Sequence, residues 1–151
     1  MYDESALLTA LAGVIKTHAN YDSSNVTIGD HRVVDSGVQT AVVVEEGSIS
    51  ASEDEENRFF MGTVSVYSFI AYVYRRYTYD AETRTNLRAD VKNLRETIDG
   101  YYRLNATAES CKVGTVSDPV YVSGQDGSGP FFMVRRLTVR VMKIEVLTEL
   151  E

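Results

Sequence analysis

Few residues in this 151-residue sequence could do chemistry: two histidines, His18 and His31, and a single cysteine, Cys111. A zinc site needs three or four suitable ligands, and the neighbouring pair Asp30–His31 with a distant His18 is too small a set. A cysteine nucleophile needs a nearby base, and no histidine is close to Cys111 in the sequence. We interpret Cys111 as a buried, inert thiol and His18 as a residue at a helix C-terminus. We therefore expect no catalytic residue, no metal site and no cofactor.

Residues 124–130 (GQDGSGP) form a glycine-rich segment that could be mistaken for a phosphate-binding loop. Their spacing does not match such a loop, and a predicted strand follows instead of a helix. Ser128 fails as a nucleophile elbow for the same reason. We predict a hairpin turn here.

The stretch 45–57 (EEGSISASEDEEN) contains six acids and no basic residue. Glu53, Asp54, Glu55 and Glu56 are adjacent, whereas a calcium loop alternates its ligands around a glycine turn. We expect a long loop joining two strands. These four acids could face a lumen, a docking partner or solvent.

Hydrophobic spacing predicts two helices. The first starts near Asp3 or Ser5 and fades near Asn20, and the second covers 80–103 with Asp80 as its N-cap. Apolar residues recur every three or four positions in both, with His18 on the first stripe: Leu7, Leu8, Leu11 and Ile15, then Leu87, Val91, Leu94, Ile98 and Tyr102.

Strands are predicted over 32–45, as a pair or one kinked strand, and over 59–79, around Pro119 and over 131–149. Residues 59–79 are apolar on both faces, which is typical of a strand covered on both sides. In 131–149 the apolar phase changes near Val141–Met142. Either a bulge inserts one residue there, or the inward face switches because a different neighbour begins.

The element order favours an α+β fold, with a mainly antiparallel sheet of long strands and helices packed on one face. We expect a single α+β domain over residues 1–151, a length typical of one domain. The N-terminal residues do not form a signal peptide, and no apolar run is long enough to span a membrane.

The charge of the chain restricts its partners. With a net charge of −7, it lacks the basic footprint of a sequence-reading nucleic-acid binder. The same charge suits a channel past which DNA slides without sticking.

Basic and tyrosine side chains on the long strands are candidate inter-subunit residues. Like charges opposite one another destabilise a sheet, so clustered arginines suggest a partner with carboxylates, for which the acidic loop of an identical neighbour is one candidate. Ordinary exposed strand arginines are the alternative. The candidates are Tyr72, Tyr74, Arg75, Arg76, Arg135 and Arg136.

In architecture the chain resembles the tail terminator subunits of long-tailed bacteriophages and related neck and tail-completion proteins. The resemblance covers most of the chain. It rests on the short helix of LLTALAGVIKTHA, the acidic loop at 45–57, the long strand of MGTVSVYSFIAYVYRRY, the helix of DAETRTNLRADVKNLRETIDGYY, and the closing strands of SDPVYVS and FFMVRRLTVRVMKIEV.

This resemblance implies a virion protein that forms a hexameric ring on the head-proximal end of the tail tube. Its partners would be copies of itself, the tail tube protein and the head–tail connector or stopper protein, with DNA passing through the lumen without sequence-specific binding. It would reside in the tail or neck, and in the host cytoplasm during assembly. Alternatives are a head–tail stopper, adaptor or other neck protein, a small enzyme with residues assembled from distant positions, and an acidic DNA mimic.

Overall fold

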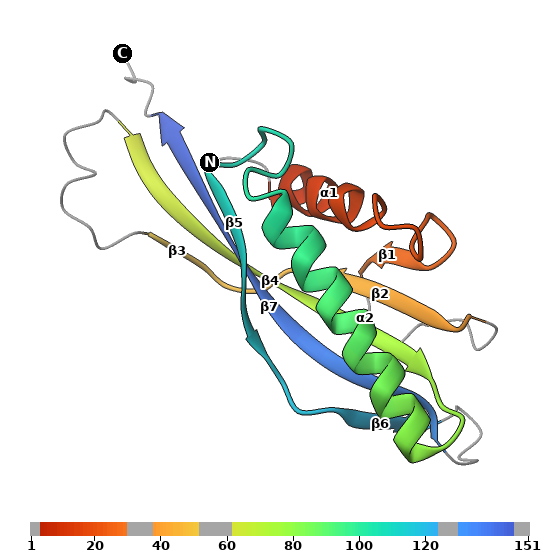
Figure 1. Ribbon diagram of the computed structural model, residues 1–151. Coiled ribbons are helices and arrows are strands. Elements are labelled where there is room, and N and C mark those ends of the chain that lie inside the picture. The colour runs from red at the N-terminus through yellow and green to blue at the C-terminus, as the bar shows by residue number, and fades with distance from the viewer. Residues whose placement is uncertain (1–3, 30–37, 52–61, 124–129, 147–151) are drawn as a thin grey trace.

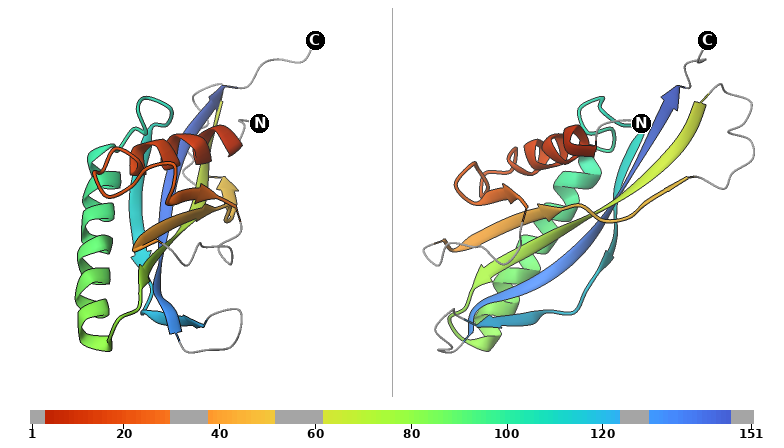
Figure 2. Two further views of the ribbon diagram at one scale, coloured as in Figure 1. Left: turned by 90° about the vertical axis from the view of Figure 1, so that its right-hand side faces the viewer. Right: turned by 180° about the vertical axis from the view of Figure 1, so that it is seen from behind.

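The computed structural model describes residues 4–29, 38–51, 62–123 and 130–146 (Figure 1). Within these residues, two helices pack on one face of a seven-stranded sheet, and the opposite face carries no helix (Figure 2). All strand pairs are antiparallel except the one at the β1 edge. The predicted α+β fold is therefore confirmed.

Two long strands, β4 (Gly62–Arg76) and β7 (Pro130–Val146), form the centre of the sheet. They pair antiparallel without interruption from Gly62↔Val146 to Arg76↔Phe132. The predicted bulge near Val141–Met142 is therefore wrong. Met142 and Ile144 instead lie on the sheet face that carries no helix.

Shorter strands flank the long ones in succession. On one side β2 (Thr40–Glu45) and β3 (Ile49–Ala51) pair with β4. On the other side β5 (Ser110–Val116) and β6 (Val120–Ser123) pair with β7. The outermost strand, β1 (Val26–Ile28), is parallel to β2.

Two of these strands depart from the sequence prediction. No strand was predicted at β1, which follows the expected end of the first helix near Asn20, and β3 lies inside the stretch predicted as a loop. Both strands are three residues long, so they depend on pairing with longer strands more than on their own composition.

Helix α1 (Glu4–Ile15) ends before His18, which lies in the following turn and not on the helix stripe. Helix α2 (Asp80–Gly100) has Asp80 as its first helical residue, and the N-cap position is held by Tyr79 in an extended conformation. The hydroxyl oxygen of Thr83 accepts a hydrogen bond from the Thr78 N–H at 3.0 Å, which secures the helix start. Tyr102 lies beyond the helix and is 60% exposed.

The apolar residues of the long strands divide between two clusters. The main core joins both helices to the odd-numbered residues of the central strands: Tyr67, Phe69, Ala71, Val73, Met133, Leu137, Val139 and Val141. A smaller cluster on the helix-free face contains Ala41, Val43, Tyr74, Phe132 and Val134. Both faces of β4 are therefore apolar, as predicted.

Candidate interaction surface

In the described part of the chain, the long strands continue past their neighbouring strands and form a two-stranded arm. β3 pairs with β4 over Ser65–Tyr67, and β5 pairs with β7 no farther than Met142. Residues 62–64 of β4 then pair with residues 144–146 of β7, and we call these two segments the arm. Figure 1 shows the arm projecting beyond both helices.

Apolar side chains are exposed on the helix-free face beside the arm. Directly paired residues share a face, so Met142 lies beside Val66, and Ile144 beside Val64. The two β4 valines are buried, whereas Met142 is 37% exposed and Ile144 is 42% exposed. Adjoining exposed apolar side chains are typical of a surface that a partner covers.

A hollow of about 450 Å³ lies at the other end of the same face. Val120 and Val122 of β6 line it and are 56% and 36% exposed. The Tyr72 hydroxyl, also in its wall, hydrogen-bonds with Glu45 and Arg136. Burial, helped by Glu45, raises the Tyr72 pKa against the opposing charge of Arg136. The hollow therefore combines apolar walls with a fixed polar group.

The four strand arginines divide between the two faces instead of gathering at one place. Arg75 pairs directly with Met133, and Arg135 pairs with Val73. Both partners belong to the main core, so the two arginines lie on the helix-covered face. Both have partners within the chain. Arg75 Nη1 lies 3.3 Å from Asp90 Oδ2, and Arg135 Nε donates to the Ser117 carbonyl at 2.9 Å.

The remaining candidates lie on the helix-free face. Arg76 and Arg136 are exposed there, and Tyr72 is half-buried. Tyr74 is only 2% exposed and packs edge-on against Phe132, with ring centroids 5.8 Å apart. Its side chain is thus committed to the small cluster within the chain.

A buried polar cluster joins α2, β2 and β4 to Tyr21 in the segment after α1, and no pattern in the sequence indicated it. Asp90 interacts with Arg75 and Thr40, and the Tyr21 hydroxyl lies 3.4 Å from the Thr40 hydroxyl. Burial raises the Asp90 pKa, which Arg75 opposes, and burial raises the Tyr21 pKa to about 12. Tyr21, Thr40 and Asp90 are each less than 10% exposed, so the cluster is closed to a substrate in this conformation.

The two chemically reactive residues that the structure describes lie apart. His18 Nδ1 accepts a hydrogen bond from the Asn20 N–H at 3.2 Å, and its ring packs against Tyr21. Cys111 is 2% exposed in the main core, where burial, with Asp99 adding to it, raises its pKa to about 12. A thiol that is buried and protonated matches the inert role predicted for it.

His31, the acids Glu53–Glu56 and the predicted turn at 124–129 lie outside the described residues. Among the residues that are described, no three His, Cys, Asp or Glu side chains are grouped as metal ligands would be. The helices in this part of the chain are also too short or too polar to cross a membrane.

A scan of the sequence against protein-family models finds no match, and a search of curated proteins finds none either.

Proposed function

We propose that this chain is a structural subunit that assembles with copies of itself into a ring through the helix-free face of its sheet. The observation that carries the proposal is the exposed apolar surface formed by Ile144 of the arm and Met142 next to it. Full burial of such a side chain contributes about 1.5–3 kcal/mol. A second copy covering this surface would gain part of that free energy, whereas the isolated chain leaves it in water.

The resemblance to tail terminator subunits suggests where such a ring acts. In this proposal it caps the tail tube of a long-tailed phage at the head-proximal end and offers its other face to the head connector. The net charge of −7 supports a lumen through which DNA passes without sticking. A head–tail stopper or other neck subunit is the alternative, because it would use the same kind of surface.

Light scattering after size-exclusion chromatography tests the assembly. We expect the wild-type chain to form a discrete oligomer, and the double variant Met142→Glu, Ile144→Glu to be monomeric. Ile28→Glu is the matched control, because Ile28 is 47% exposed on β1, away from the arm. An oligomer that survives the double variant, or that the control disrupts equally, would contradict the proposed surface.

Electron microscopy of purified tails mixed with gold-labelled protein tests the location. Label at the head-proximal end of the tube supports the terminator role, and label on isolated head connectors alone supports a stopper. Label on neither would refute the phage role while leaving the assembly surface to be judged by the scattering result.

A further inference from the structure

Basic side chains gather along α2 and around the β5 edge of the sheet, on both faces of that edge. α2 contributes Arg84, Arg88 and Arg95, whose spacings of four and seven residues place them on one side of the helix. The strands contribute Lys112, Arg135 and Arg140. Together these are six of the 15 Lys and Arg residues in a chain of net charge −7. We call these six residues the cationic seam; Lys112 and Arg140 lie on the helix-free face, and the other four lie on the side of α2.

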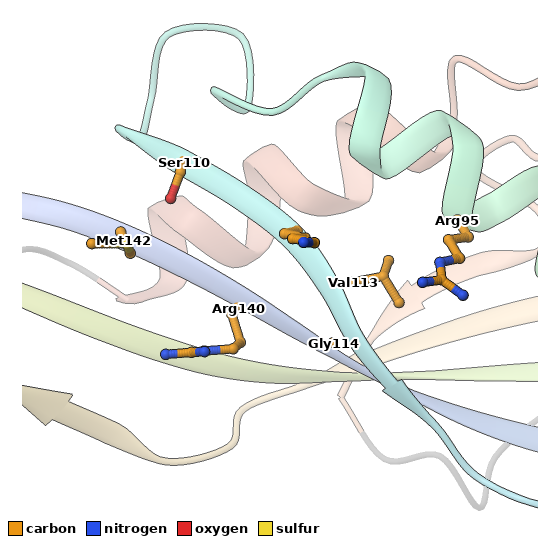
Figure 3. A pocket seen from close by; sticks show the side chains of 7 residues that line it. Arg95, Ser110, Val113, Gly114, Arg140 and Met142 are labelled. Atoms are coloured by element: carbon orange, nitrogen blue, oxygen red, sulfur yellow. The ribbon is translucent and has the colours of Figure 1, made fainter.

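Two hollows open along the cationic seam. One, of about 390 Å³, is lined by Arg95, Lys112 and Arg140 together with Ser110, Val113, Gly114 and Met142 (Figure 3). The other, of about 220 Å³, is lined by Arg84, Arg88 and Arg135 together with Leu87, Pro119 and Met133. No carboxylate lines either hollow. Each therefore offers positive charge without an acid of its own to neutralise it.

Most of the cationic seam has no anionic partner within the described chain. Arg84 is paired with Asp80 at 2.9 Å, but Arg88, Arg95, Lys112 and Arg140 make no ion pair with any described residue. Lys112 lies directly opposite Arg140 in the β5–β7 register. Like charges in that position destabilise a sheet, and a bound anion would relieve the repulsion.

We infer that the cationic seam binds the acidic stretch Glu53–Glu56 of a second copy of this chain, an inference that rests on the proposed ring assembly. That stretch joins β3 to β4, whereas β5 lies on the opposite edge of the sheet. A contact between opposite edges of neighbouring copies is heterologous, and repeated contacts of this kind form a ring when the rotation between copies closes. Four adjacent carboxylates carry the charge opposite to that of the cationic seam.

Protein carboxylates are favoured over nucleic-acid phosphates as the occupant. A chain of net charge −7 repels a long polyanion over a distance comparable with the Debye length. A second copy carries the same net charge, but only its four adjacent carboxylates need to meet the basic residues, whereas duplex DNA carries one negative charge about every 1.7 Å along its axis. Binding should consequently weaken steeply as salt is added.

Fluorescence anisotropy with a labelled peptide of residues 49–57 (ISASEDEEN) tests the inference. The receptor is the full chain carrying Glu53→Gln, Asp54→Asn, Glu55→Gln and Glu56→Gln, so that its own acids do not compete. We expect saturable binding that falls at least tenfold between 50 and 500 mM salt, as screening predicts. A peptide with the same four acids neutralised should not bind.

Adding Arg88→Gln, Lys112→Gln and Arg140→Gln to the receptor should weaken peptide binding at least tenfold. The control is Lys16→Gln, Arg76→Gln and Arg103→Gln, which removes three exposed cations outside the cationic seam. Circular dichroism verifies that both receptors fold, and single substitutions replace the triple variant if it does not. Equal binding to both receptors would overturn the inference.

Two further results separate this inference from the proposed function. A stable wild-type ring with no peptide binding overturns the seam inference and leaves the ring standing. A monomeric wild type that binds the peptide refutes the ring and leaves the seam as a site for acidic polypeptide. If the peptide does not bind but duplex DNA binds tightly, and if that binding depends on the same three residues, the carboxylate assignment is overturned in favour of phosphate.

Discussion

The two faces of the sheet are built from the same strands but differ in how far their side chains are buried. On the helix-covered face the odd-numbered apolar residues of the central strands, such as Phe69 and Val139, are fully buried. On the helix-free face the even-numbered residues grade from the buried pair Tyr74 and Phe132 to Ile144, which is 42% exposed. The comparison shows that alternation in the sequence states which residues share a face, whereas burial depends on what packs over that face.

The largest expected difference is in stability. Leu94 is fully buried between α2 and the sheet. The substitution Leu94→Ala should therefore lower the free energy of unfolding by about 2–5 kcal/mol. Ile144→Ala removes a similar side chain from the helix-free face and should cost well under that in the unassembled chain. Urea denaturation at low protein concentration measures both. Equal losses would contradict the division of the sheet into a covered and an uncovered face.

A smaller effect is expected where the β2–β3 connection crosses β4. A Cβ atom at Gly47 would lie 1.9 Å from the Ser68 carbonyl oxygen, so Gly47→Ala must displace backbone. We expect a loss of about 1–3 kcal/mol by thermal or urea unfolding. Gly13→Ala is the control, because a Cβ there meets no atom within 4 Å and the site is helical, so it should stabilise by about 0.5–1 kcal/mol. Similar effects at both glycines would show that the close approach is absent.

The smallest expected effect is a pH dependence from the covered side. Burial raises the pKa of Asp90 above its ordinary value of 3.8, although Arg75 opposes the rise. The folded state therefore binds a proton more readily than the unfolded state. The stability of the wild-type protein relative to Asp90→Asn should be greatest at a pH below 3.8, the ordinary pKa of Asp90. It should fall as the pH rises through the raised pKa of Asp90 in the folded state. Urea unfolding of both proteins from pH 3 to 7 measures this, and a difference that grows with pH would contradict the sign.

The sequence predicted the elements whose patterns are long. The stripe of Leu87, Leu94 and Ile98 defines α2, and the apolar residues on both faces of 59–79 define β4, since each pattern repeats over several turns or pairs. β1 and β3 could not be predicted, because three residues carry no periodicity and form only against a partner strand.

The candidate surface was only partly visible in the sequence. The phase change at Met142 and Ile144 was the available signal for exposed apolar residues, but a bulge explained it equally well until the continuous register excluded one. The Arg75–Asp90 pair joins a strand to a helix 15 residues away, and the cationic seam combines residues of α2 with residues of β5 and β7. Such combinations depend on how the helix packs, which residue spacing does not specify.

Methionine oxidation tests most directly whether copies cover the helix-free face. Met142 is 37% exposed and should be oxidised readily in the Ile144→Glu variant once light scattering shows that variant to be monomeric, whereas Met133, at 1% exposed, is the internal control in both samples. In the wild-type oligomer we expect Met142 to be protected severalfold relative to that variant. An oligomer in which Met142 reacts as fast as it does in the monomer would contradict the account.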